Sequence, residues 1–270
     1  MTPPTPKAVD ETERPWVDGL TIGQVLAETA DRHAGNDAVV FPQLDMRLSY
    51  ADLERQVYSA AKGLLALGIE PGQHVAVWST NVPEWIILQL ATARIGAVLV
   101  TINPAYRPFE LKYALRQSDA VALFLVDRFK TSDYYAMLAE VCPEFSTASP
   151  GRLASAEFPQ LKHVVGFKEK VPSGAYTWSQ LLDLGRNVDA QELADVEQRV
   201  DPAAPINIQY TSGTTGFPKA AMLTHRNLLL NAFYVGACQN LSAADRICIP
   251  VPFYHCFGCG AHGTAVGFLM

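Results

Sequence analysis

The sequence predicts an α/β fold in which largely parallel sheets are covered by helices on both faces. Short apolar runs alternate along the chain with helical patterns of about 10–15 residues, as expected for strand–helix–strand crossovers. The composition also indicates a packed fold, because 49% of the 270 residues are hydrophobic and only 18% are charged. Such a composition excludes wholesale disorder and a coiled coil.

The chain divides into an N-terminal arm, 1–18, and a single domain, 19–270. The arm is rich in proline, threonine and charged residues, and we expect it to be flexible. A polar stretch at 168–204 separates the first strands and helices of the domain from its last third.

Helix starts are marked by capping and first-turn residues. Thr21 and Ser49 are candidate caps, and Ser49 has Asp52 three residues later, which is the spacing of a capping box. Pro83 stands where a proline fits the first turn of a helix. The expected helices span 21–33, 49–68, 83–95, 109–117, 132–141, 178–184, 191–198 and 224–239.

Strands are expected where apolar runs follow turn residues. Pro71-Gly72 precedes the run from His74 to Trp78, and Gly96 precedes the next one. The expected strands span 38–41, 46–50, 74–78, 97–101, 121–126, 161–167, 205–210, 220–223 and 246–251.

The charge and cysteine content limit the class of protein. With 21 Lys and Arg against 27 Asp and Glu, the net charge is −6, which argues against a nucleic-acid partner. The first residues, MTPPTPKAVDETERP, contain no apolar segment of a secretory signal. Five cysteines, an odd number in a long chain, favour a reducing, cytoplasmic compartment.

The end of the chain, 247–270, contains no Asp, Glu, Lys or Arg. A membrane span would need about 20 continuous apolar residues with a basic flank. Pro250 and Pro252 shorten the apolar run, and no basic residue follows it. We therefore expect buried core here and no transmembrane segment.

The loop between the strands at 205–210 and 220–223 carries the clearest chemistry. It reads Thr211-Ser212-Gly213-Thr214-Thr215-Gly216-Phe217-Pro218-Lys219. The glycines allow successive backbone N–H groups to turn inward around an anion, and the hydroxyls add donors for phosphate oxygens. The lysine adds a full positive charge. The pattern favours phosphate binding over a plain polar surface turn.

Two well-known nucleotide loops are excluded at this place. A Walker A loop ends in Gly-Lys-Ser/Thr, whereas Lys219 lies three residues past Gly216 and precedes Ala220. The loop also lacks the Gly-x-Gly-x-x-Gly fingerprint of a dinucleotide-binding fold.

The segment 210–219, YTSGTTGFPK, resembles the phosphate-binding signature of the adenylate-forming, or AMP-binding, superfamily. This superfamily comprises acyl-CoA synthetases, luciferases and peptide-synthetase adenylation domains. Three further segments resemble the family and stand in its order: NPAY at 103–106, MLTHRN at 222–227 and PFYHCFG at 252–258. The last segment is most similar to fatty acyl-CoA synthetases.

The resemblance implies that the chain is part of the large N-terminal domain of an AMP-forming acid–CoA ligase. In such an enzyme ATP activates a carboxylic acid, here expected to be a fatty acid, as an acyl-adenylate. Coenzyme A then takes the acyl group and AMP leaves. ATP, Mg²⁺ and coenzyme A are the implied substrates and cofactors, and a homodimer is compatible with this assignment.

The resemblance also assigns roles to residues. The phosphates of ATP are expected at Thr211, Ser212, Gly213, Thr214, Thr215, Gly216 and Lys219. The acyl pocket is expected at His255, Phe257 and Gly258. The adenylation lysine and the small C-terminal domain of the family are expected beyond residue 270. No catalytic residue is therefore assigned, and the 270 residues alone are not expected to complete adenylation.

A metal-site interpretation of His255, Cys256, Cys259 and His262 competes with this assignment. A structural zinc site usually takes two ligand pairs separated by a loop, whereas these four residues crowd into eight positions. We therefore expect no metal site and interpret the cysteines as core residues.

Other aromatic and histidine residues have simpler interpretations. His225 and Arg226 open a helix, and the sequence leaves open whether they face an anion or solvent. Trp85 is expected in the core, and Tyr134 and Tyr135 on the surface.

Two other functions stay open. The chain could be a non-enzymatic remnant that binds a nucleotide or a partner protein, or an adenylation domain that loads a carrier protein. The sequence also leaves open the acyl chain length, the oligomeric state and whether the truncation is natural.

Overall fold

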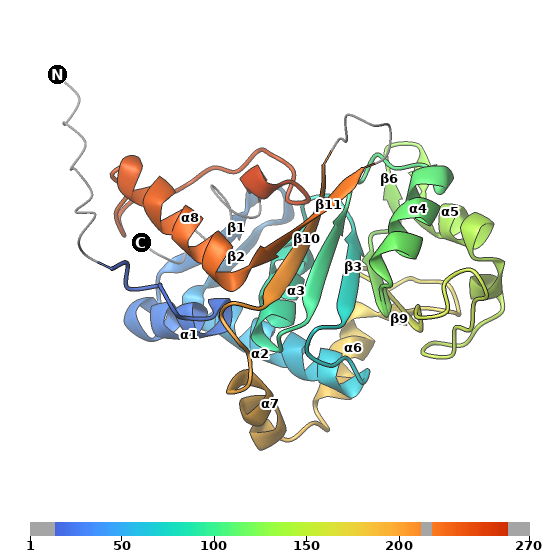
Figure 1. Cartoon of the computed structure of the whole chain (residues 1–270), viewed down its shortest axis with the longest axis horizontal. Helices are drawn as coiled ribbons and strands as arrows, with labels where there is room; N and C mark the ends of the chain where they lie inside the picture. Colours follow the sequence, from blue (N-terminus) through green and yellow to red (C-terminus); the bar gives the residue numbers. More distant parts are fainter. Residues whose placement is uncertain (1–13, 212–217, 259–270) are drawn as a thin grey trace.

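The computed structural model describes residues 14–211 and 218–258 (Figure 1). The α-helices in these ranges are α1 Ile22–His33, α2 Tyr50–Ala66, α3 Pro83–Arg94, α4 Pro108–Ser118, α5 Tyr134–Val141, α6 Trp178–Gly185, α7 Ala190–Glu197 and α8 His225–Cys238. The strands are β1 Asp37–Phe41, β2 Met46–Ser49, β3 His74–Trp78, β4 Val98–Ile102, β5 Ala122–Leu125, β6 Arg128–Phe129, β7 Ser132–Asp133, β8 His163–Gly166, β9 Tyr176–Thr177, β10 Pro205–Thr211 and β11 Lys219–Thr224.

A seven-stranded sheet forms the centre of the molecule, with the strand order β11-β10-β4-β3-β5-β8-β9. Neighbouring strands pair in parallel except for β10 and β11, which form an antiparallel hairpin. In the register of the middle strands, His74 lies opposite Val98 and Val75 opposite Ala122. The predicted α/β class with a largely parallel sheet is confirmed.

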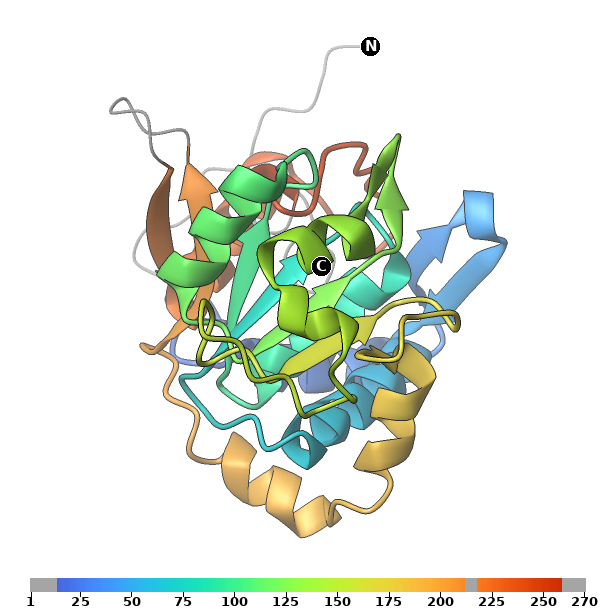
Figure 2. The same cartoon turned by 90° about the vertical axis from the view of Figure 1, so that its right-hand side faces the viewer.

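Helices cover both faces of this sheet (Figure 2). α4 and α5 contact each other on one face, where α4 also contacts β3 and β4. On the other face α3 contacts β4, and α1 and α2 pack on α3. Every residue from Trp85 to Ala93 in α3 is buried, because this helix lies between the sheet and the outer helices.

The middle strands are buried on both sides. No residue of β4 or β5 is more than 3% exposed. These strands are therefore continuous apolar runs rather than alternating ones, as expected for parallel strands covered on two faces. They form a rigid platform for the segments at their carboxyl ends.

The predicted helix starts at Thr21 and Ser49 are confirmed. The Thr21 hydroxyl accepts a hydrogen bond from the Gln24 backbone N–H at 3.2 Å, and the Gln24 side chain accepts one from the Thr21 N–H at 2.8 Å. Ser49 and Asp52 form the same reciprocal pair. Capping boxes of this kind satisfy backbone donors that the first helical turn leaves unpaired.

The strand predicted at 246–251 is wrong. Its residues alternate in burial as a strand would, with Ile247 and Ile249 half-buried and Arg246 and Cys248 exposed. A strand also needs backbone partners, and none of the strands in the described ranges pairs with this segment. The segment therefore has no regular secondary structure.

The packed part of the chain begins before the predicted boundary between 1–18 and 19–270. Val17 is 1% exposed, and Asp18 forms ion pairs with Arg14 and Arg226. Residues 14–18 therefore pack on the domain, whereas 1–13 lie outside the described residues.

The charge-free stretch 247–270 is described only as far as residue 258. Phe253 is buried, as expected for core, but residues 255–257 are exposed, so the core prediction is wrong for them. These residues lie in a surface turn that no other described segment covers. Within 14–211 and 218–258, no helix is long and apolar enough to cross a membrane.

Candidate functional site

The ends of the predicted phosphate loop meet at the carboxyl end of β10. Thr211 and Lys219 are register partners, and the Thr211 hydroxyl donates to the Lys219 carbonyl at 3.4 Å. Both residues are exposed. The other predicted phosphate-binding residues, Ser212, Gly213, Thr214, Thr215 and Gly216, lie outside the described residues. We call the pair Thr211 and Lys219, with Pro218, the loop mouth.

Helix α4 lies beside the loop mouth (Figure 2). The Tyr113 hydroxyl donates to the Pro218 carbonyl at 3.3 Å, and the Tyr210 hydroxyl donates to the Ala114 carbonyl at 3.1 Å. Burial, followed by the nearby Tyr113 and Tyr106 hydroxyls, raises the pKa of Tyr210. Its hydroxyl therefore remains a donor at neutral pH.

The second predicted motif, 252–258, is held at the carboxyl ends of β3 and β4. Asn81, which follows β3, donates to the Val251 carbonyl and accepts from the Phe253 N–H, both at 2.9 Å. The Thr101 hydroxyl of β4 contacts the Tyr254 carbonyl at 2.9 Å and the Ile208 carbonyl of β10 at 3.3 Å. One side chain of β4 thus links this motif to the strand that leads into the phosphate loop.

The predicted acyl-pocket residues lie in a tight turn within this motif. The Gly258 N–H donates to the His255 carbonyl at 2.9 Å, and the Phe257 N–H donates to His255 Nδ1 at 3.3 Å. His255 is exposed, Phe257 is 45% exposed and Gly258 is buried. A Cβ on Gly258 would overlap the Pro252 carbonyl oxygen and lie 2.8 Å from its carbon, so only glycine fits there. Their role toward an acyl group remains a prediction.

The position between β3 and β5 is closed by an aromatic pair. In a doubly wound sheet, ligands usually bind at the carboxyl ends of two neighbouring strands whose following connections run to opposite sides of the sheet. Here β3 and β5 are such a pair, because β3 is followed by β4 on one side and β5 by β8 on the other. The Trp78 and Tyr134 rings stack there at 3.6 Å with an interplanar angle of 1°. Trp78 Nε1 donates to the Asn103 carbonyl and the Tyr134 hydroxyl to the Pro104 carbonyl. This pair leaves the β4–β10 side as the accessible part of the edge.

Comparison with known proteins identifies the family. A family profile described as "AMP-binding enzyme" matches residues 26–267. The chain belongs to the AMP-binding enzyme family. YngI of Bacillus subtilis is 46% identical over 239 residues, which cover 88% of this chain and 44% of YngI. "Medium-chain acyl-CoA ligase ACSF2, mitochondrial" of Danio rerio is 40% identical over 240 residues, 88% of this chain and 39% of that protein.

Solved structures of related proteins share the fold. The acetoacetyl-CoA synthetase of Streptomyces lividans matches with a TM-score of 0.74 and 26% identity, over 93% of this chain and 37% of that one. The chain spans about two fifths of the length of the curated relatives that it matches. It therefore carries part of what a complete AMP-binding enzyme contains.

Sequence reasoning missed several residues that hold the predicted site segments in place. Asn81, Thr101 and Tyr113 act through contacts with segments more than 100 positions away. Tyr134 was expected on the surface, but it is fully buried because it closes the edge between β3 and β5. Nothing in the local pattern around these residues reports such contacts.

The structure decides the position of His225, which the sequence left open. His225 is fully buried, and its Nδ1 accepts from the Ile22 N–H of α1 at 3.1 Å. Burial lowers its pKa to about 4. It is therefore shielded from solvent and joins α8 to α1. Arg226 instead pairs with Asp18 at 2.8 Å.

Two of the four residues weighed as metal ligands, His255 and Cys256, lie in the described part of this member of the AMP-binding enzyme family. Within 14–211 and 218–258, no group of three or more His, Cys, Asp or Glu could hold a metal ion. Cys256, which was expected in the core, is exposed because it lies in the surface turn of the 252–258 motif. Cys259 and His262 lie outside the described residues.

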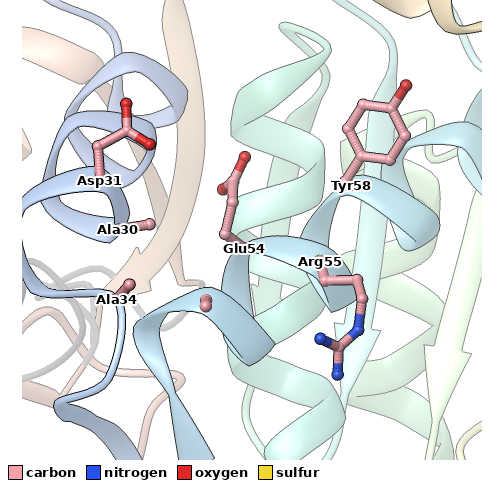
Figure 3. Close-up of a pocket in the computed structure, with 7 residues that line it drawn as sticks. Ala30, Asp31, Ala34, Glu54, Arg55 and Tyr58 are labelled. Carbon is pink, nitrogen blue, oxygen red and sulfur yellow. The ribbon is translucent and has the colours of Figure 1, made fainter.

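A groove between α1 and α2 lies apart from the site (Figure 3). Its lining comes from these two helices and the turn after α1: Ala30, Asp31, Ala34, Ala51, Glu54, Arg55 and Tyr58. Glu54 is already paired with Arg94 at 2.5 Å. The groove includes no residue of the carboxyl edge, and we assign it no part in the site.

Proposed function

We propose that this chain forms the phosphate- and acid-binding part of an enzyme that activates a carboxylic acid, preferably a fatty acid, with ATP. The observation that carries the proposal is the position of Thr101. Its hydroxyl contacts the strand that leads to the loop mouth and the 252–258 motif, at 3.3 Å and 2.9 Å. A nucleotide phosphate at the loop and an acid at the motif would therefore meet at one edge of the sheet.

The chemistry requires this proximity. In the first step, a carboxylate oxygen attacks the α-phosphorus of ATP, the bond to the bridging oxygen breaks, and pyrophosphate leaves with the electron pair. In the second step, the thiol of coenzyme A attacks the acyl carbon, loses its proton and displaces AMP. Lys219 and the loop hydroxyls would offset the negative charge that grows on pyrophosphate. The residues around His255 would orient the acid.

Mg²⁺ would enter as the complex with ATP. The described residues offer no cluster that would hold the ion without nucleotide. When bound with ATP, the ion would offset charge on the phosphate oxygens. We also propose a cytoplasmic location, supported by the free cysteines Cys142, Cys238, Cys248 and Cys256.

Substitution of Lys219 tests the proposed function. In the complete enzyme, Lys219→Ala should lower kcat/KM for ATP by about 100-fold or more, because it removes charge that stabilises the leaving pyrophosphate. His255→Ala should affect ATP use far less and act on the acid instead. Lys170→Ala, an exposed lysine after β8, is the matched control. The measurement is fatty-acid-dependent exchange of pyrophosphate into ATP.

The outcomes separate the alternative functions. Equal and small effects of Lys219→Ala and His255→Ala would contradict the assignment. Nucleotide binding without any acid-dependent exchange would favour a non-enzymatic role. Exchange that is followed by acyl transfer to a carrier protein, and not to coenzyme A, would favour a carrier-loading domain.

A further inference from the structure

Two tyrosines connect α4 to both sides of the loop mouth. Tyr113 of α4 donates to the carbonyl of Pro218, the residue before Lys219. Tyr210, the residue before Thr211, donates back to the carbonyl of Ala114 in α4. The helix therefore holds the strand that leads into the loop and the segment that leaves it, each through one hydroxyl.

Helix α4 is itself fixed to the sheet. Its inner residues Leu111, Ala114 and Leu115 are no more than 3% exposed, and α4 contacts β3, β4 and α5. Its first turn is closed by the Arg107 N–H, which donates to the Glu110 side chain at 3.0 Å. A residue of the loop mouth that is hydrogen-bonded to this helix is therefore held in a fixed position relative to the central sheet.

The residues that follow the loop, Pro218 and the start of β11, have few other contacts that would fix their backbone. Within the described ranges β11 pairs with β10 alone, and residues 219–222 are exposed. The ladder between these strands starts at Lys219, so the Pro218 carbonyl lies outside it. Among the described residues, the Tyr113 hydroxyl donates a hydrogen bond to this carbonyl.

We propose that Tyr113 is a positioning residue for ATP binding, which holds Pro218 and thereby the backbone of Lys219 at the loop mouth. The inference rests on the proposed function, in which Lys219 contacts the phosphates. Because the Pro218 carbonyl belongs to the same peptide plane as the Lys219 N–H, fixing one places the other. For Lys219 itself, only the side chain then has to be fixed when phosphate binds, which lowers the entropic cost of its contact.

The variant Tyr113→Phe removes the hydroxyl and keeps the ring. In the complete enzyme, it should raise the KM for ATP, and the Kd for MgATP measured by calorimetry, by about three- to tenfold, as expected when the hydrogen bond to the Pro218 carbonyl is lost. The KM for the acid and for coenzyme A and the melting temperature should stay unchanged. A purely structural role would instead lower the melting temperature or change all kinetic constants together.

Tyr234→Phe is the matched control, because Tyr234 lies on α8, is 41% exposed and loses the same hydroxyl. It should leave the KM for ATP unchanged. An unchanged KM for ATP in Tyr113→Phe, or an equal change in Tyr234→Phe, would overturn the inference.

A double-mutant cycle separates this inference from the proposed function. If Tyr113 acts through Lys219, Tyr113→Phe should have no further effect on MgATP affinity in a Lys219→Ala background. Full additivity of the two substitutions would overturn the positioning role. If Lys219→Ala alone leaves ATP use unchanged, the proposed function fails. If it weakens ATP use while Tyr113→Phe does not, only the inference fails.

Discussion

Two regions of the carboxyl edge of the sheet differ sharply. Between β3 and β5, the Trp78 and Tyr134 rings stack at 3.6 Å and are fully buried. At the end of β10, Thr211 and Lys219 are exposed and face each other across an antiparallel pair. Both regions stand at strand ends of the same sheet, yet one is filled by its own side chains and the other is open.

The difference shows that the predicted binding site does not lie at the position usual for doubly wound sheets. Doubly wound sheets commonly bind ligands where the strand connections diverge. Here the Trp78 and Tyr134 rings fill that position. The Trp78 Nε1 and the Tyr134 hydroxyl donate to the carbonyls of Asn103 and Pro104 and so hold that turn in place. The predicted site lies instead at the ends of β4 and β10, where Thr101 contacts both β10 and the 252–258 motif.

The largest effect should come from opening the closed region. Trp78→Ala removes a fully buried ring, its stacking partner contact and its hydrogen bond to Asn103, so the free energy of unfolding should fall by about 3–5 kcal/mol. Urea denaturation measures this change. Phe109→Ala, at a position that is 72% exposed, should change the unfolding free energy by less than about 0.5 kcal/mol. Similar losses of unfolding free energy in the two variants would contradict the view that the ring pair between β3 and β5 is a closed, packed region.

An acid-sensitive contact at the far end of β11 should give the next largest effect. Burial lowers the pKa of His225 to about 4, so the folded protein keeps this ring neutral, whereas the unfolded chain takes up a proton near pH 6.5. The unfolded state therefore binds more protons between these values. The contribution of His225 to stability should fall by roughly 3 kcal/mol as the pH drops from about 6.5 to about 4, and should stay constant above that range.

The variant His225→Asn isolates this contribution. Asparagine can place an oxygen where Nδ1 accepts from the Ile22 N–H, but it takes up no proton in this range. The difference in unfolding free energy between the unsubstituted protein and the variant should therefore shrink on acidification. Parallel pH profiles for the two proteins would contradict burial of a neutral His225. The lowered pKa of His163 affects both proteins alike and cancels.

The smallest effect tests the turn beside the open region. Gly258→Ala would place a methyl group against the Pro252 carbonyl, 2.8 Å from its carbon and 3.1 Å from the Phe253 Cα. The turn must shift, at a cost of about 1–3 kcal/mol. We expect kcat/KM for the acid to fall by about tenfold while the KM for ATP holds. Gly35→Ala, where no atom lies within 4 Å of the new methyl group, should match the unsubstituted protein; a loss of equal size there would refute this account.

Much of the fold was predictable because its signals are local. Thr21 and Ser49 cap helices through residues three positions away, so the sequence shows both partners. The strand predicted at 246–251 had the right alternation and failed, because a strand also needs a neighbour that no local pattern specifies.

The candidate site was predictable only in part, for the same reason. The sequence pointed to the loop 211–219, since glycines, hydroxyls and a lysine in a short stretch suit phosphate chemistry wherever they lie. The 252–258 motif was predicted from the family resemblance alone. It did not show that Thr101 brings them to one edge, or that α4 reaches Pro218 through Tyr113.

The sequence by itself determined the α/β class, most helix and strand positions, and the resemblance to AMP-binding enzymes that the family profile confirms. Those properties depend on periodicity and on neighbours within a few positions. The tertiary structure alone decided that Tyr134 closes one part of the edge, that His225 is buried against α1, and that the loop mouth stays open. Burial and strand pairing arise between segments far apart in the chain, and only the folded arrangement specifies them.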